Sequence, residues 1–102
     1  MSPTQRSIKH LKEQGLRPWV VEYWNPFAKR RIDLYNCIDI IAIGQGKTWA
    51  VQTTSTPNIS ARIKKLQESE YFPIMENVGW KVVVHGWAKK KNKYVLTERI
   101  LC

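Results

Sequence analysis

Two apolar stretches on either side of a short glycine turn predict a β-hairpin, and this hairpin constrains the fold more than any other feature. Residues 37–43 (CIDIIAI) and 48–54 (TWAVQTT) have the composition of strands, and the sequence GQGK at residues 44–47 separates them. A two-residue loop pairs Gly44 with Lys47, and a four-residue loop pairs Ile43 with Thr48. Both loops give the same register, so the pairing of the strands can be predicted from the turn.

This register places Asp39 opposite Gln52 and Cys37 opposite Thr54, with Gln52 and Thr54 on one face of the sheet. A carboxylate inside so apolar a strand is costly unless a metal, a cation or several donors meet it. Asp39 is therefore the most informative residue of the chain. Two interpretations of it remain open: a metal ligand, or a structural carboxylate held by backbone donors or by an arginine such as Arg31 or Arg62.

The remaining patterns predict helices and strands around this hairpin. A helix begins at Pro3, with Ser2 as N-cap and Gln5 completing a capping box, and Gly15 ends it. The other predicted elements are a strand at 17–24, an exposed basic loop at 25–36, a helix at 59–70, a strand at 80–87 and an edge strand at 94–101. With 102 residues and no repeat or linker, the chain is expected to form one domain over residues 1–102. Its fold class is α/β, with a mixed sheet of about five strands flanked by helices in the order αβββαββ.

The charge of the chain predicts a polyanionic partner. Seventeen Lys and Arg residues against eight Asp and Glu residues give a net charge of +9. Nucleic acid is the expected partner, and an anionic membrane or an acidic protein is the alternative. The basic residues expected to contact phosphates, unless they are only solvated surface, are Lys29, Arg30, Arg31, Arg62, Lys64, Lys65, Lys89, Lys90, Lys91 and Lys93.

Other features suggest a cytoplasmic protein. The first ten residues lack the apolar stretch of a secretory signal, and no apolar run reaches the length of a membrane span. The two cysteines, Cys37 and Cys102, have no metal-binding or redox spacing. The tryptophans are expected to fill the core or a dimer interface, with base stacking by Trp24 or Trp87 as the alternative.

The segments RRIDLYNCIDIIAI, WAVQTTS and NISARIKK, in this order and spacing, resemble the PD-(D/E)XK nuclease superfamily. The likeness is closest to its small Holliday-junction-resolvase-like and phage-encoded members, and it runs from about Ile8 to Trp87. It implies a restriction-endonuclease-like core and hydrolysis of phosphodiester bonds with Mg²⁺ or Mn²⁺. By this resemblance, Asp39 is a metal ligand, Gln52 occupies the acidic position of the motif, and Thr54 occupies its lysine position.

The resemblance assigns further residues around this degenerate motif. The carbonyl of Thr53 would complete the metal ligands, and Lys64 or Lys65 would replace the missing lysine. Resolvase-like members also carry an acidic residue in the first turn of the opening helix, where this chain has residues 4–6 (TQR). By position in the sequence, Glu13 and Glu22 are expected to be poor replacements for it. Asp33 is expected to be a turn residue with at most a minor supporting role beside the metal.

The function expected from these observations is a metal-dependent DNA endonuclease, acting on branched DNA and working as a homodimer in a bacterial or phage-infected host cell. DNA is favoured over RNA by the resemblance alone. Two alternatives stay open because only Asp39 keeps the residue of the family. They are a catalytically inactive nuclease fold that binds nucleic acid through its basic face, and a protein-interaction or inhibitor domain.

Overall fold

The computed structural model describes residues 1–102, and a five-stranded mixed sheet with the strand order β1-β4-β5-β6-β7 lies at its centre. β5 and β6 run parallel, and the other neighbours in this sheet are antiparallel. The elements are α1 (Pro3–Glu13), β1 (Arg17–Val20), β2 (Tyr23–Asn25), β3 (Arg30–Ile32), β4 (Ile40–Gly44), β5 (Lys47–Ser55), the 3₁₀ helix η1 (Thr56–Asn58), α2 (Ile59–Glu68), α3 (Phe72–Asn77), β6 (Lys81–Lys90) and β7 (Lys93–Ile100). The predicted fold class, α/β with a mixed five-stranded sheet flanked by helices, is confirmed.

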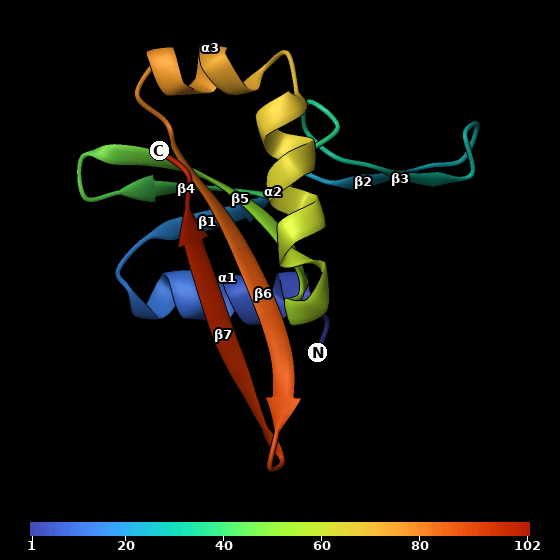
Figure 1. Ribbon diagram of the computed structural model, residues 1–102, viewed down its shortest axis with the longest axis vertical. Helices are drawn as coiled ribbons and strands as arrows, with labels where there is room; N and C mark the ends of the chain where they lie inside the picture. The colour runs from blue at the N-terminus through green and yellow to red at the C-terminus, as the bar shows by residue number, and fades with distance from the viewer.

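Helices cover the sheet on both faces, which follows from the alternation of buried side chains along its strands (Figure 1). One core cluster lies under α1 and includes Leu11, Ile40 and Val51. The other lies under α2 and α3 and includes Leu66 and Val84. The central strands are therefore buried on both sides and consist of nearly continuous apolar residues. None of the helices has the length and apolar character needed to cross a membrane.

The β4–β5 hairpin has the predicted register, with Gly44 paired to Lys47 and Ile40 paired to Val51. Gln45 and Gly46 both have positive φ, 55° and 72°, as the tight turn that matches strand twist requires. β4 begins only at Ile40, however. The predicted pairing of Cys37 with Thr54 was wrong, because the N–H of Cys37 donates to the carbonyl of Leu34 in a tight turn that precedes the strand.

The predicted strand at 17–24 is in fact two strands in different sheets. β1 pairs with β4 as far as Val20, and the last main-chain bond is from the N–H of Val21 to the carbonyl of Asp39. Beyond Val21, no strand of the five-stranded sheet lies beside the chain, and the chain leaves that sheet. The predicted loop at 25–36 contains β3, which pairs with β2. We call residues 23–32 the arm, and Figure 1 shows it projecting away from the rest of the molecule.

Two further expectations from the sequence differ from the structure, the second only in part. The segment between α2 and β6, for which no helix was predicted, forms the short helix α3, with Pro73 in its first turn. Two of the five tryptophans meet the expectation of core packing, since Trp49 and Trp80 are half-buried against the core clusters; Trp87 is also half-buried, whereas Trp19 is 77% exposed and Trp24 is 58% exposed. The core is built from small β-branched and aliphatic side chains, which suit a sheet covered on both faces.

A buried polar network joins α1 to β6 and to the edge strand β7 on one face of the sheet. The indole N–H of Trp87 donates to Ser7 Oγ at 2.9 Å, so the Ser7 hydroxyl proton is free to donate to His85 Nδ1, also at 2.9 Å. His85 Nε2–H then donates to Glu98 Oε2 at 2.8 Å. Burial lowers the pKa of His85 below its ordinary value of 6.5, so this contact is a hydrogen bond to a neutral ring at neutral pH.

We expect Ser7→Ala to lower the free energy of unfolding by roughly 1–3 kcal/mol, because it leaves a buried indole N–H and a buried ring nitrogen without partners. Urea denaturation measures this change. Ser2→Ala, which removes an exposed N-cap of the same helix, is a suitable comparison and should cost about 1 kcal/mol. A loss at Ser7 no larger than a few tenths of a kcal/mol would show that the network does not contribute to stability.

Candidate functional site

A polar cleft lies where β4 begins, between the start of α1, the base of the arm and the start of α2. Its volume is about 510 Å³, and none of its lining side chains is hydrophobic. Its lining residues are Pro3, Thr4, Glu22, Arg31, Asp33, Asp39, Gln52, Thr53, Thr54, Ser55 and Arg62. The cleft therefore collects the hairpin residues predicted from the sequence together with residues from four other segments.

Asp39 is the buried centre of this cleft, with 4% of its surface exposed. Its Oδ2 accepts three hydrogen bonds, from Gln52 Nε2 at 2.8 Å, from the N–H of Thr53 at 2.8 Å and from Thr53 Oγ1 at 3.1 Å. The predicted neighbourhood of Asp39 and Gln52 is thus present in the structure. These bonds fix the orientation of the carboxylate and come from one side.

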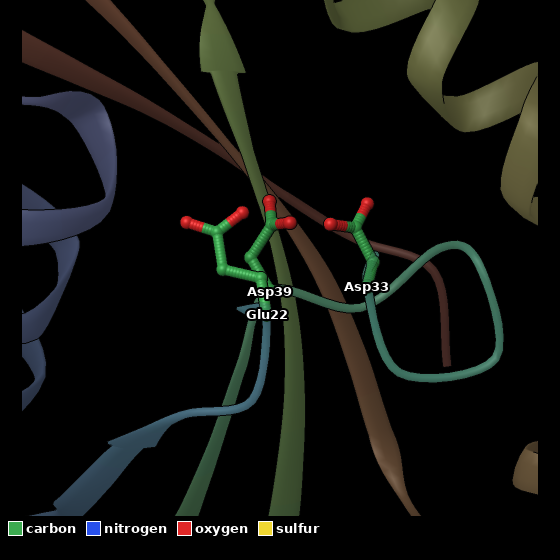
Figure 2. A group of neighbouring side chains, drawn as sticks. All are labelled: Glu22, Asp33 and Asp39. Carbon is green, nitrogen blue, oxygen red and sulfur yellow. The ribbon is translucent and has the colours of Figure 1, made fainter. Parts of the chain in front are cut away.

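Two more carboxylates approach Asp39 on its other side. Ligand oxygens of Glu22, Asp33 and Asp39 all lie within 4.8 Å of one another. Figure 2 shows Asp39 between the other two, with the three carboxyl groups turned toward the same space. Glu22 follows β1, and Asp33 follows β3, so the two ends of the arm carry them to the mouth of the β4–β5 hairpin.

Burial is the main reason that the pKa of Asp39 is raised from its ordinary value of 3.8 to about 7. The N–H of Thr53 opposes this change, whereas the negative charges of Asp33 and Glu22 and a hydrogen bond shared with Asp33 add to it. Without a cation, the cluster thus retains a proton at Asp39 near neutral pH. A perturbed carboxyl group beside like charges in a cleft is typical of a functional site.

Gln52 provides a second, independent observation that the cleft suits a cation. Its side chain is 1% exposed, yet Oε1 has no hydrogen-bond partner. Rotation of the amide by half a turn would place Oε1 where Nε2 now lies, 2.8 Å from Asp39 Oδ2. Two oxygens so close repel unless a cation lies against both, and adjacent oxygen ligands of Mg²⁺ are about 3 Å apart. The donors present, all oxygens and three of them carboxylates, fit Mg²⁺ or Mn²⁺.

The cleft also contains two cationic side chains and a hydroxyl network. Arg31 Nη1 lies 3.9 Å from Glu22 Oε1, and Arg62 of α2 lines the same cleft. Thr4 Oγ1 lies 3.4 Å from Glu22 Oε1 and 3.1 Å from Thr53 Oγ1. Glu22 therefore reaches the first turn of α1, the place where the resolvase-like pattern has its acidic residue. Glu22 was expected from its place in the sequence to be a poor replacement for that residue, but the fold brings its carboxylate to the helix start.

Other expected site residues are distributed differently. Thr53 and Thr54 line the cleft, but Lys64 and Lys65 do not; they line a separate hollow on α2 with Tyr35 and Tyr71. Lys64 Nζ lies 4.0 Å from Glu68 Oε1 at the surface. α2 turns Arg62, rather than these lysines, toward Asp39. Asp33 was expected to have a minor role, yet it is one of the three clustered carboxylates.

The remaining basic residues lie on two projecting hairpins. Lys29, Arg30 and Arg31 lie on the arm. Lys89 and Lys90 end β6, Lys91 lies in the turn and Lys93 begins β7, and all four are exposed. Both groups are exposed and available for contact with a polyanion.

The site residues that sequence reasoning missed are Glu22 and, in its full role, Asp33. One signal would find both once the strand pairing is known: they flank a short aromatic and basic segment that lies between two strands of one sheet. When a chain leaves a sheet and returns to it, the residues at the two ends of the excursion must lie near one another. No family model matches the sequence, and no match was found among curated proteins or among solved structures.

Proposed function

We propose that this protein is a metal-dependent endonuclease that hydrolyses phosphodiester bonds in DNA at the cleft around Asp39. The observation that carries the proposal is the three-carboxylate cluster, which lies beside the buried side chain of Gln52, whose Oε1 has no hydrogen-bond partner, in a chain of net charge +9. A protein that binds a polyanion gains nothing from carboxylates in its cleft unless a cation offsets them. Mg²⁺ or Mn²⁺ would supply an activated water and neutralise charge on the phosphate.

Each residue of the cleft has a role under this proposal. Asp39, Glu22 and Asp33 hold the metal, with oxygen from Gln52 and the carbonyl of Thr53 as further ligands. Thr53 orients Asp39 through its N–H and hydroxyl. Arg31 and Arg62 bind the phosphate oxygens, because a guanidinium matches phosphate geometry. In the reaction, a water molecule loses one proton to solvent as its oxygen bonds to phosphorus, the bond from phosphorus to one sugar oxygen breaks, and that oxygen takes up a proton from solvent and leaves as an alcohol.

The proposal is tested by incubating the protein with labelled branched, duplex and single-stranded DNA in Mg²⁺, in Mn²⁺ and in EDTA. We expect cleavage in either metal and none in EDTA. Gel analysis of the product ends then gives the bond that breaks. Absence of cleavage in both metals, with salt-sensitive binding retained, would reject the enzyme and leave a binding protein.

A binding protein of the same fold is the second candidate, and one observation favours it. The cleft has no lysine, since Thr54 occupies that position of the motif and Lys64 and Lys65 lie elsewhere. Under this alternative, the basic hairpins hold nucleic acid and the carboxylates have no role in chemistry. The cleavage experiment separates the two candidates directly.

We also propose a homodimer in the cytoplasm of a bacterial or phage-infected cell. A chain of this size has one cleft, and paired cuts in a branched or duplex substrate require two. DNA is preferred to RNA because of the likeness to junction-resolving nucleases.

A further inference from the structure

The arm has more exposed aromatic surface than any structural role requires. Phe27 is 95% exposed, Trp24 is 58% exposed and Tyr23 is 56% exposed. Single exposed aromatics are common, but three on one ten-residue hairpin mark the arm as a site of interaction, with Trp24 on one face, Tyr23 on the other and Phe27 at the tip.

The tip of the arm is held in one conformation. Asn25 Oδ1 accepts from the N–H of Phe27 at 2.9 Å and from the N–H of Ala28 at 3.1 Å, and Pro26 fixes the backbone between them. Phe27 is thus presented on an ordered turn. An aromatic ring on such a turn loses little conformational entropy when it binds a partner.

The arm also places cations beside its aromatic residues. Trp24 pairs with Arg31, so both side chains lie on one face of the arm, while Asn25 and Arg30 lie on the other. Arg31 Nη1 is 3.9 Å from Glu22 Oε1, so the face that carries Trp24 continues into the cleft. A molecule on this face can therefore contact the ring of Trp24 and the cleft at the same time.

We propose that the arm is a base-stacking element, in which Trp24 and Phe27 stack on unpaired or unstacked bases while Lys29, Arg30 and Arg31 hold the adjoining phosphates. The inference rests on the proposed function and specifies the part of the substrate that the arm contacts. Stacking on aromatic rings tolerates any base, because every base has a π-face. The arm is a poor site for contact with the same arm of a second copy, because each arm carries Lys29, Arg30 and Arg31.

The test measures binding in EDTA, where no cleavage occurs, by fluorescence anisotropy with two single-stranded oligonucleotides of equal length. One carries bases and the other is abasic at its central positions. Wild type is expected to bind the base-bearing strand more tightly. Trp24→Ala and Phe27→Ala should each weaken binding to that strand roughly tenfold and leave binding to the abasic strand nearly unchanged. Trp19→Ala removes an indole of β1 that is more exposed than that of Trp24, at 77% against 58%, and is the matched control, with no effect expected.

Three results would overturn the proposal. They are unchanged binding by both arm variants, equal losses on both strands, and a change in oligomeric state of the arm variants on a sizing column. In contrast, Lys29→Gln should weaken binding to both strands alike and lower the salt dependence of binding by about one charge. None of these measurements needs cleavage. They can therefore reject the stacking proposal without rejecting the nuclease proposal, and the cleavage experiment can reject the nuclease proposal without rejecting stacking.

Discussion

Replacing Asp39 by Asn is expected to lower the metal-dependent cleavage rate by more than about 100-fold. Mutation of a residue that only supports a metal ligand already lowers metal affinity or activity by about 10–100-fold, and loss of a ligand itself should cost more. Asp39 is the buried centre of the carboxylate cluster, and Thr53 and Gln52 hold its Oδ2 in place. An asparagine has a similar shape and keeps an oxygen for these donors, but it removes the negative charge that a cation requires. Initial rates of DNA cleavage in Mg²⁺ and in Mn²⁺ measure the effect.

Glu76→Gln is the matched control, since it removes the same charge from the exposed surface of α3, away from the cleft. It should cleave at the wild-type rate. DNA binding in EDTA should be retained by both variants, and at pH 8, where Asp39 is charged, Asp39→Asn should bind at least as tightly as wild type because the cleft loses a negative charge. Cleavage by Asp39→Asn within a factor of a few of wild type would reject Asp39 as a metal ligand.

The parts of this site that the sequence predicts are those set by local geometry. The turn at Gln45-Gly46 allows only a narrow choice of loop, and this choice fixes which residues face one another along β4 and β5. The proximity of Asp39 and Gln52 follows from that register. The first helix is equally local, since Ser2 and Gln5 form the predicted capping box.

The contribution of Glu22 could not be predicted in the same way, because it depends on a pairing between distant strands. The arm separates β1 from β4, and no turn chemistry fixes their register. The bond from the N–H of Val21 to the carbonyl of Asp39 is what brings Glu22 beside the cluster. The expectation that Lys64 or Lys65 reaches the cleft failed for a related reason. The rotation of α2 about its own axis is set by Ile59 and Leu66, which pack in the core. That rotation directs Arg62 to the cleft.

The composition of the arm does not distinguish it from the strand that precedes it. Tyr23 and Trp24 have high strand propensity, so they continue the pattern of β1 and predict a single longer strand. Propensity reports that a residue suits a strand and does not say which sheet the strand joins. The start of β4 at Ile40 decides where β1 must stop. A strand cannot extend beyond its neighbour without leaving main-chain groups unpaired.

Asp39→Asn is also expected to stabilise the metal-free protein at pH 8, by roughly 2–4 kcal/mol in the free energy of unfolding. The pKa of Asp39 rises from 3.8 in the unfolded chain to about 7 in the folded protein, chiefly because burial disfavours the charged carboxylate. The folded state thus binds this proton more tightly than the unfolded state. Stability falls as pH rises from about 4 to about 7, and the full cost of about 4 kcal/mol is present only above that window. Asparagine does not titrate and avoids this cost.

The decisive quantity is the difference in the free energy of unfolding between Asp39→Asn and wild type at each pH. Urea denaturation in EDTA from pH 4 to pH 8 measures it. Taking the difference cancels the titration of His85, whose lowered pKa acts on stability in the opposite direction as pH falls. The advantage of Asn over Asp should shrink steadily toward pH 4. A constant difference across this range would show that Asp39 is not held at a raised pKa.

Addition of Mn²⁺ at pH 8 should stabilise wild type and leave Asp39→Asn nearly unchanged, because only the carboxylate gains from the cation. The cost of burying Asp39 in the folded protein would then be the cost of keeping a metal ligand ready, as is common where activity requires a strained site.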